Sequence, residues 1–440
     1  MENQENASTY QLECLLEKAR NESFACIFVS GGRSDSHGQF SLMAGLGATA
    51  VYSDLDSVPH CPDVPIMGYV GYDVKNQIEP SLSSSHAQLV AFDPLKFVQP
   101  KVWLAIDRLG GIFGDPSLLE GRSCLDDGLE GKSEGKTVLN HKETTNSLSV
   151  DFAAPRWRSQ TSKDTYIQQV ERIKQYIVDG DFYEMNYCIA FTAEQDLDPY
   201  HAFLLLHRNA PAPFSVFLKD RNRYLLCASP ERFFGKRGDR IFSQPIKGTR
   251  PRVFLQDTAE IDIQKDAEVA QTLMNSEKDR AENVMIVDLV RNDLSKVCEV
   301  GSVVVPECCA VYSFSHVHQL ISTVEGKVSS SVRFHDLIRA LFPMGSMTGA
   351  PKISVMQHTE QLESFSRGIY SGTVGYIWKN NMDFNVVIRA LQYDAGTQVL
   401  AYAVGGAITY DSLAEDEYQE CLDKASAVLS IFSTDQLSNL

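Results

Sequence analysis

The sequence predicts an α+β protein with a large proportion of antiparallel sheet. Short apolar runs with strand composition recur along the whole chain and are separated by turn residues. Helical spacing of apolar residues is confined to a few segments. The two kinds of segment follow one another irregularly, without the regular strand–helix alternation of parallel α/β folds. With 440 residues, 43% of them hydrophobic and 22% charged, the chain is expected to bury a large core.

The chain divides by composition into three parts. Residues 1–114 contain short strand patterns such as FACIFVS, IMGYVGYDV and KVWLAIDRLGGIFGD. Residues 115–160 are polar and are expected to form a linker or an insertion. Residues 161–436 carry sharper patterns and the chemically distinctive motifs.

The elements of the third part are expected in a definite order. A helix comes first, because Tyr166, Val170, Ile173 and Ile177 recur at helical spacing before Gly180. A strand follows at FYEMNYCIAFTAE. Further strands are predicted at FSVFL, RYLLCA, RIFSQ, SVVVPE, TVGYIW, NVVIRALQY and VLAYAVGG, with helices near 265–291, 333–341 and 412–432.

Charge and cysteine usage exclude several classes of protein. A formal net charge of -17 would repel nucleic acids and anionic membranes, so neither is an expected partner, although a local basic pocket is allowed. The 10 cysteines form no CxxC pair, which argues against a zinc ribbon or a redox motif and favours a reducing compartment. No signal peptide or membrane-spanning run is recognised, so the cytoplasm is the expected location.

One lysine stands out in the segment SQPIKGTRPR. A hairpin around GKRGDR, with pairing symmetric about Asp239, would set Glu231 opposite Lys247 on one face. An amine beside an acid suits a reaction in which the amine attacks carbon and the acid protonates a leaving group. Four nearby cations would disfavour the charged amine by repulsion, namely Lys236, Arg237, Arg250 and Arg252. Glu231 acts in the opposite direction, so the residues alone leave the net pKa shift of Lys247 open. The alternative is a surface lysine in a cross-strand ion pair.

Carboxylates on two predicted helices form a candidate metal site. In AEDEYQECLDKASAVLSIF, Glu417, Glu420 and Lys424 share one side of a helix. Two carboxylates one turn apart can hold a hard cation such as Mg²⁺. A further acid, Glu282 in DRAENVMIVDLVRND, lies on an otherwise apolar helical segment. The alternatives are a solvated helix face with a Glu-to-Lys pair, and a capping or paired glutamate at 282.

The segment AVGGAITYDS is a candidate anion site. A strand that runs into Gly405, Gly406 and Ala407 would expose successive backbone N–H groups, which suits a carboxylate. Arg389 in NVVIRA could add a bidentate clamp on the same anion. A plain turn with a paired arginine is the alternative.

Taken together and in order, these segments resemble the chorismate-utilising family, whose members include anthranilate, aminodeoxychorismate, isochorismate and salicylate synthases. The resemblance covers roughly residues 160–435 and rests on SPERF, PIKGTRPR, DRAENVMIVDLVRND, VVVPE, SMTGAPK, GYI, VIRA, GGAITYDS and EYQECLDKA. It implies the fold of anthranilate synthase component I, an α/β sandwich in which two orthogonal antiparallel sheets enclose the active site and helices lie outside. The N-terminal segment would then belong to the same body.

The resemblance also implies roles for individual residues. Glu282 and Glu420, with Glu417 nearby, would hold Mg²⁺ against the ring carboxylate of chorismate. The enolpyruvyl carboxylate would be bound by Tyr376, Arg389, Gly405, Gly406 and Ala407, with Lys424 as a further substrate-binding residue. Gly248 and Thr249 would line the ring.

Lysine at position 247 distinguishes branches of the family. Anthranilate synthases typically carry alanine there, whereas aminodeoxychorismate synthases carry lysine. The resemblance therefore implies amination of chorismate at C4 through a covalent Lys247 intermediate, with Glu231 assisting loss of the hydroxyl group. The cationic surroundings would loosen the lysine proton and attract the dicarboxylate substrate. No amidotransferase nucleophile is found, so ammonia would come from a separate glutamine amidotransferase subunit.

One position departs from the family pattern. Many relatives have a histidine before Leu-Val-Ser, where this chain has Gln319 before Leu320, Ile321 and Ser322. If that histidine acts in pyruvate elimination, its absence is compatible with a product that keeps its enolpyruvyl group.

Two alternatives to an aminodeoxychorismate synthase stay open, an anthranilate synthase component I and a non-catalytic, regulatory chorismate-binding protein.

Overall fold

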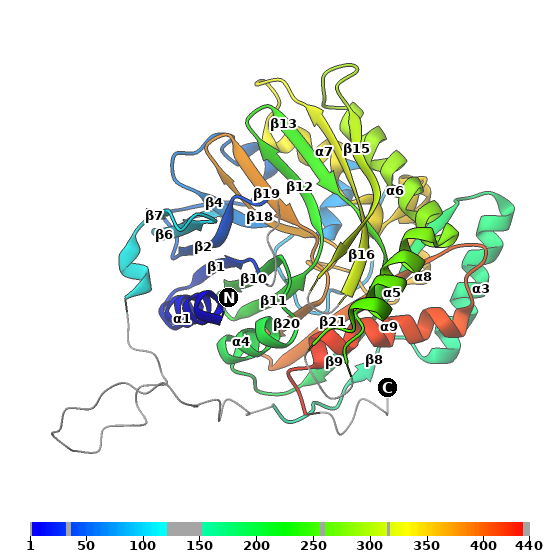
Figure 1. Cartoon of the computed structure of the whole chain (residues 1–440), viewed down its shortest axis with the longest axis horizontal. Coiled ribbons are helices and arrows are strands. Elements are labelled where there is room, and N and C mark those ends of the chain that lie inside the picture. The colour runs from blue at the N-terminus through cyan, green and yellow to red at the C-terminus, as the bar shows by residue number, and fades with distance from the viewer. Residues whose placement is uncertain (1, 32–36, 121–151, 256–259, 315–316, 434–440) are drawn as a thin grey trace.

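Two antiparallel sheets surrounded by helices form the centre of the molecule (Figure 1). A computed structural model describes residues 2–31, 37–120, 152–255, 260–314 and 317–433. Every pairing between the named strands of this part of the chain is antiparallel. The predicted α+β class with two antiparallel sheets is confirmed.

The first sheet has 11 strands in the described residues. Its order is β17 (Gly349–Ala350), β9 (Glu184–Glu194), β21 (Val399–Ile408), β20 (Ala390–Asp394), β11 (Arg223–Ser229), β10 (Phe214–Asp220), β1 (Phe24–Val29), β2 (Phe40–Leu46), β6 (Val102–Asp107) and β7 (Ile112–Gly114), and β8 (Arg158–Ser159) pairs with β9.

The second sheet has 10 strands in the same part of the chain. Its order is β14 (Ile246–Pro251), β16 (Val317–Lys327), β13 (Arg240–Gln244), β12 (Arg232–Arg237), β19 (Asn381–Asn385), β18 (Thr373–Trp378), β4 (Ile66–Val70), β5 (Leu95–Gln99) and β3 (Ala50–Tyr52), and β15 (Val304–Ser313) pairs with β16.

Strands from the N-terminal segment are shared between the two sheets. β1 pairs with β10 of the later part of the chain, with Phe24 opposite Asp220. β4 pairs with β18 in the same way, with Met67 opposite Tyr376. Residues 1–114 are therefore built into both sheets. Most of the polar segment predicted as a linker, residues 115–160, lies outside the described residues.

Helices cover the outer faces of the sheets, and a separate core lies between the sheets. The helices are α1 (Glu2–Ala19), α2 (Lys75–Ile78), α3 (Lys163–Asp179), α4 (Pro199–Asn209), α5 (Ile263–Asn275), α6 (Glu277–Ser295), α7 (Phe334–Leu341), α8 (Lys352–Leu362) and α9 (Ala414–Leu429). α1, α3, α4 and α9 pack against the first sheet, and α6 and α7 against the second. Between the sheets, Val374 and Met67 of the second meet Val216 and Leu225 of the first.

Local signals explain the boundaries of several helices. α3 begins after Ser162, whose hydroxyl accepts a hydrogen bond from the Thr165 N–H, and ends at Gly180 with φ 87°. The predicted stop at Gly180 is confirmed. The helical stretch predicted near 265–291 is two helices, because Ser276 has extended dihedrals and caps α6. α1 and α4 were not predicted, although Asp198 before Pro199 is a typical helix start.

The strand predicted at RYLLCA is confirmed as β11, whereas the strand predicted at NVVIRALQY is wrong, because the chain passes from one sheet to the other inside it. A similar crossing follows β11. β11 ends at Ser229 in the first sheet and β12 begins at Arg232 in the second. The segment NVVIRALQY starts at the end of β19 in the second sheet and continues as β20 in the first. The two crossings lie side by side, since the Val386 N–H donates to the Glu231 carbonyl at 3.0 Å and the Ala228 N–H to the Arg389 carbonyl at 3.0 Å. Glu231 and Arg389 are brought together in this way.

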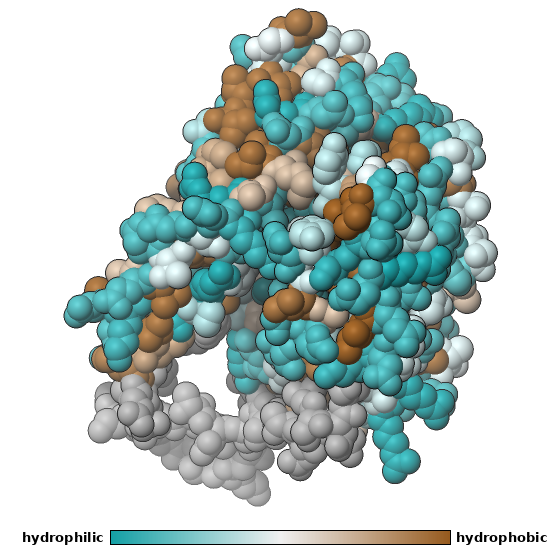
Figure 2. Space-filling view, turned by 90° about the vertical axis from the view of Figure 1, so that its right-hand side faces the viewer, coloured by the Kyte–Doolittle hydropathy of each residue, from teal (hydrophilic) through white to brown (hydrophobic). Residues whose placement is uncertain are grey.

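The surface is predominantly hydrophilic on the face that carries α3, α8 and α9, with separate apolar patches (Figure 2). Charged residues are abundant in the sequence, with a formal net charge of -17. In the described part of the chain no helix is both long enough and apolar enough to cross a membrane.

Candidate active site

Lys247 lies where the edges of the two sheets approach each other. It belongs to β14 at the end of the second sheet, and its Nζ donates a hydrogen bond of 2.7 Å to Oε1 of Glu184, the first residue of β9 in the first sheet. Only 10% of the Lys247 side chain and none of the Glu184 side chain is exposed. The alternative of a solvated surface lysine is therefore excluded.

The predicted cross-strand pair of Glu231 and Lys247 is wrong. β12 and β13 do form a hairpin, with Arg237 opposite Arg240, but Lys247 lies beyond Pro245 on β14, which pairs with β16. Glu231 nevertheless faces the same site from the crossing between β11 and β12. Burial raises the pKa of Glu231 to about 7, and the charge of Lys247 opposes this rise. The acid and the amine share one site without being paired strand residues.

The predicted effect of the neighbouring cations on Lys247 is also wrong. Each cation has a partner of its own: Lys236 bonds to Asn380 and Gly238, Arg237 to Asp383, Arg250 to Asp279 and Arg252 to Asp266. The pKa of Lys247 is raised, because the carboxylate of Glu184, helped by Glu282 and Glu231, outweighs the opposing effect of burial. Lys247 is thus an ammonium group among carboxylates in the free protein.

Three carboxylates predicted to bind metal face one another across α6 and α9. Lys278 Nζ lies 4.0 Å from Oε1 of Glu282 and 3.9 Å from Oε1 of Glu417. Burial raises the pKa of Glu282 to about 7, and the charge of Glu184 adds to the rise. Lys424 bonds to Glu420 at 2.7 Å, and although burial acts in the other direction this ammonium lowers the pKa of Glu420. The group therefore brings three acids together with two lysines, and burial favours the neutral form of Glu282 and Glu417.

The donor set of this group suits a hard divalent cation, since carboxylate oxygens are the ligands that Mg²⁺ prefers. The group is not preassembled, however. In the described ranges no three acidic, histidine or cysteine side chains are arranged so that they could hold a metal as they stand. The Lys278 ammonium lies between Glu282 and Glu417, so a bound cation would have to displace it.

Gly405, Gly406 and Ala407 lie within β21 and not in a turn, so the predicted run of successive free N–H groups is wrong. Gly405 is opposite Cys188 of β9, and the Cys188 N–H donates to Glu363 Oε1, away from β21. The N–H and C=O of Gly405 must therefore also point away from β9, and by the two-residue repeat those of Ala407 as well. β20 pairs with β21 only as far as Tyr402, so the edge of β21 that faces away from β9 extends past the end of β20.

The edge of β21 beyond Tyr402 is framed by the other predicted binding residues. Lys424 Nζ donates to the Gly405 carbonyl at 3.0 Å. A Cβ atom at Gly406 would lie 3.0 Å from Glu417 Oε2, which places the anionic group beside this glycine. The structure therefore brings Gly405, Gly406, Lys424 and Glu417 together.

Arg389 has no partner for its charge among the described residues. It adopts φ 50° at the crossing between β19 and β20, and its guanidinium makes no hydrogen bond or ion pair with any described residue. Burial lowers its pKa. Continuing the β20–β21 register, in which Leu391 faces Tyr402, would set Arg389 opposite Val404, next to Gly405. A half-buried cation without a charged partner beside such N–H groups is suited to binding an anion.

Gly248 and Thr249 lie next to Lys247 in an irregular part of β14. The pairing with β16 shifts between Ile246 and Thr249, and Gly248 has φ 82°, which favours glycine. Thr249 pairs with Gln319, the residue that departs from the family pattern. His318 points toward α5 and bonds to Asp266 at 3.0 Å, so Gln319, which is also buried, points to the opposite face of β16.

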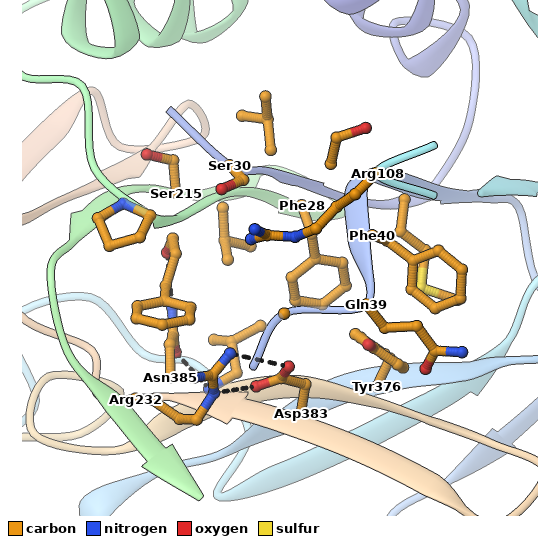
Figure 3. A pocket seen from close by; sticks show the side chains of 18 residues that line it. Phe28, Ser30, Gln39, Phe40, Arg108, Ser215, Arg232, Tyr376, Asp383 and Asn385 are labelled. Atoms are coloured by element: carbon orange, nitrogen blue, oxygen red, sulfur yellow. Dashed lines mark hydrogen bonds and ion pairs between the residues drawn. The ribbon is translucent and has the colours of Figure 1, made fainter. Parts of the chain in front are cut away.

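Tyr376 lines a different cavity (Figure 3). Its ring centroid lies 5.8 Å from those of Phe28 and Phe40. The ion pair of Arg232 and Asp383, at 2.8 Å, lines the same cavity. The structure groups Tyr376 with these residues and not with the cluster around Lys247.

Two residues near the site were missed by sequence reasoning. Glu184 is an acid in the apolar run FYEMNYCIAFTAE, and a charged residue in a predicted buried strand is a signal that could have identified it. The hydroxyl of Tyr370 lies 3.8 Å from Cys188 Sγ, opposite Gly405. Tyr370 has no comparable signal, because it lies in a loop before β18 and only its tertiary position places it near the glycines.

Comparison with known proteins supports the resemblance in sequence. Residues 32–430 match the profile of a family described as chorismate binding enzymes. Aminodeoxychorismate synthase component 1 from Escherichia coli (strain K12) is 41% identical over 274 residues, 62% of this chain and 58% of the relative. The protein of the same name from Bacillus subtilis (strain 168) is 37% identical over 292 residues, 66% of this chain and 59% of the relative. The match spans less than two thirds of the length of these relatives.

Solved structures share the fold. Anthranilate synthase component I from Streptococcus pneumoniae TIGR4 has a TM-score of 0.68 at 24% identity, covering 86% of this chain and 83% of that one. The menaquinone-specific isochorismate synthase from Escherichia coli has a TM-score of 0.70 at 16% identity, covering 95% and 91%. At this level of identity the likeness shows the fold alone.

Proposed function

The chain belongs to the family of chorismate binding enzymes, and from this membership we propose that it is an aminodeoxychorismate synthase component I. It would convert chorismate and ammonia to 4-amino-4-deoxychorismate and water, a step toward 4-aminobenzoate and folate. The observation that carries the proposal is Lys247, a lysine held almost completely out of solvent among the carboxylates of Glu184, Glu231 and Glu282. A buried lysine with several acids around it is a candidate nucleophile.

The first half of the reaction uses Lys247 and Glu231. The neutral amine of Lys247 forms a bond to C2 of chorismate, the ring double bonds shift, and the C4–O bond breaks. Glu231 gives its proton to the departing hydroxyl, which leaves as water. Its pKa of about 7, a consequence of burial, keeps a large fraction of Glu231 protonated at neutral pH.

The second half of the reaction releases the lysine. Ammonia forms a bond to C4, the double bonds shift back, and the bond between C2 and Lys247 breaks. The new C4 ammonium gives one proton to the Glu231 carboxylate, so the acid is restored. The enolpyruvyl group takes no part in either half and stays on the product.

Substrate binding is assigned to the unpaired cation and the open strand edge. Arg389 would bind the enolpyruvyl carboxylate together with the N–H groups of Gly405 and Ala407. Glu282 and Glu420, with Glu417 nearby, would hold Mg²⁺, which supplies positive charge for the ring carboxylate of chorismate. Lys424 would keep its bond to the Gly405 carbonyl and so orient that edge.

Ammonia would come from a glutamine amidotransferase subunit. The relatives in Escherichia coli and Bacillus subtilis are named as component 1 of their synthases, which implies a second component. Free ammonia would act as a weaker substitute for that subunit.

Incubation of the full chain with chorismate, Mg²⁺ and an ammonium salt, followed by mass spectrometry of the products, tests the proposal. We expect 4-amino-4-deoxychorismate with its enolpyruvyl group intact. Release of pyruvate together with anthranilate would overturn the proposal in favour of an anthranilate synthase component I. Binding of chorismate without turnover would favour the regulatory protein.

A further inference from the structure

Glu184 is a charged side chain to which the reaction above assigns no step. Its Oε1 accepts the hydrogen bond from Lys247, and its Oε2 is buried with no hydrogen-bond partner among the residues that the structure describes. A buried carboxylate with an unsatisfied oxygen is costly to maintain. A structural ion pair would not require such an arrangement, because a fully satisfied pair is more stable.

The backbone on both sides holds this carboxylate in place. Gly349 of β17 packs so closely on Glu184 that a Cβ atom there would lie 2.1 Å from the Glu184 carbonyl oxygen. Two residues further along β9, the Asn186 carbonyl accepts a hydrogen bond of 2.9 Å from Arg367, and the Asn186 N–H donates to the Thr348 carbonyl at 2.8 Å. The backbone at Glu184 is therefore held in place, with the side chain at hydrogen-bond distance from Lys247.

We propose that Glu184 is the proton acceptor that converts the Lys247 ammonium to the nucleophilic amine. This assignment rests on the proposed function. Before attack, one proton moves from Nζ to Oε1 along the existing hydrogen bond, which leaves a neutral amine and a neutral carboxyl group. After the bond between C2 and Nζ breaks, Glu184 returns this proton to Nζ and the ion pair is restored. No proton is gained from or lost to solvent by the pair.

Other acids that face Lys247 are less suited to this step. Glu231 faces it from the crossing of β11 and β12, and Glu282 faces it from α6. Neither makes a hydrogen bond to Lys247 in the described part of the chain. Glu231 must also start protonated in order to act as the acid, so it cannot accept the first proton. Glu282 lies one turn along α6 from Lys278, whose ammonium is 4.0 Å from its carboxylate.

The test measures how fast the Lys247 adduct forms when ammonia is withheld. The full chain is mixed with chorismate and Mg²⁺ in rapid quench, and intact mass is recorded between pH 6 and pH 9. The variants are Glu184→Gln, Glu184→Asp and, as a matched control on the exposed end of the same strand, Glu194→Gln. Chorismate KM and the melting temperature are measured for each variant.

We expect Glu184→Gln to slow adduct formation at pH 7 by about 100-fold. The charge of Glu282 would still hold the lysine proton, which must then leave to solvent. The ratio of variant to wild-type rate should therefore rise with pH. Glu184→Asp, which keeps a carboxylate, should be slower than wild type with a ratio that does not change with pH. Glu194→Gln should match wild type.

A ratio near one for Glu184→Gln at every pH would overturn the assignment. So would a uniformly slow Glu184→Gln with no rise in the ratio, since a merely structural role predicts that result. If Glu184→Gln does not fold, Glu184→Asp provides the test. A ratio of its rate to the wild-type rate that changes with pH would also overturn the assignment of Glu184. If the wild-type chain forms neither adduct nor aminodeoxychorismate, the proposed function itself fails, which is distinguishable because the control variant then fails too.

Discussion

The raised pKa of Glu231 predicts how turnover depends on pH. In the proposed reaction the protonated carboxyl group gives its proton to the leaving hydroxyl. Since burial brings its pKa to about 7, the rate of adduct formation should fall about tenfold for each pH unit well above 7. This fall in rate above pH 7 reports the deprotonation of Glu231. Proton transfer between Lys247 and Glu184 does not contribute to it, because that pair exchanges no proton with solvent.

The size of the effect follows from the environment of Glu231. A glutamate with the ordinary pKa of 4.5 would be protonated in about one molecule in 300 at pH 7. With a pKa of about 7 roughly half of the molecules carry the proton, so burial increases the active fraction by about 150-fold. Only 6% of Glu231 is exposed, so solvent does little to reduce this effect.

Single-turnover measurements at saturating chorismate would isolate this step from product release. Glu231→Gln should reduce the rate of adduct formation by about 100-fold or more at pH 6, because the amide cannot donate a proton as an acid. The fall above pH 7 should disappear in this variant, while chorismate KM changes little. If Glu231→Gln kept both the wild-type rate and the same pH limb, Glu231 would not be the acid and this reasoning would be refuted.

Three further predictions concern the charged groups around the substrate. Lys247→Ala should form no adduct and should lose about 3–5 kcal/mol of stability, measured by denaturant unfolding, because Glu184 is left buried and unpaired; unchanged stability would contradict the burial of the pair. Arg389→Gln should raise chorismate KM by about 10-fold or more without lowering the melting temperature, since Arg389 has no partner in the part of the chain that the structure describes. A large loss of stability would contradict the anion-binding role. Glu420→Gln and Glu282→Gln should each raise the Mg²⁺ concentration that gives half of the maximal rate, because each removes a carboxylate ligand. The circular dichroism spectrum should not change. A Mg²⁺ concentration for half-maximal rate equal to that of the wild type would exclude both residues from the metal site.

Much of the fold was predictable because its signals are local. The apolar spacing from Tyr166 to Ile177 and the stop at Gly180 depend only on neighbouring residues, and α3 is found there. Strands such as β9 and β18 were recognised from their composition. The break at Ser276 was missed because the helical patterns of α5 and α6 follow each other with a single capping residue between them.

The chemistry of the candidate site was predictable in kind but not in arrangement. Lys247 and Glu231 were identified from their motifs, and the structure places both in one site. Their predicted pairing was wrong because Pro245 and the bulged β14 carry Lys247 past the hairpin partner of Glu231. Tyr376 was assigned to the site from its motif, but the side of β18 on which it lies faces the aromatic residues of the N-terminal strands.

The sequence by itself determined the class of the fold, many of its strands and helices, and the motifs that contain Lys247 and Glu231, because these depend on short-range patterns. Only the tertiary structure decided that Lys247 meets Glu184, 63 residues away in the chain. It also decided that the crossings at Glu231 and Arg389 lie together. Within the described ranges it leaves Arg389 without a partner, while the cations near Lys247 each have one. The physical reason is that strands buried on both faces, such as β9, are interchangeable by composition. Their neighbours are selected by the packing of the whole chain, and the partner of each buried charge follows from that selection.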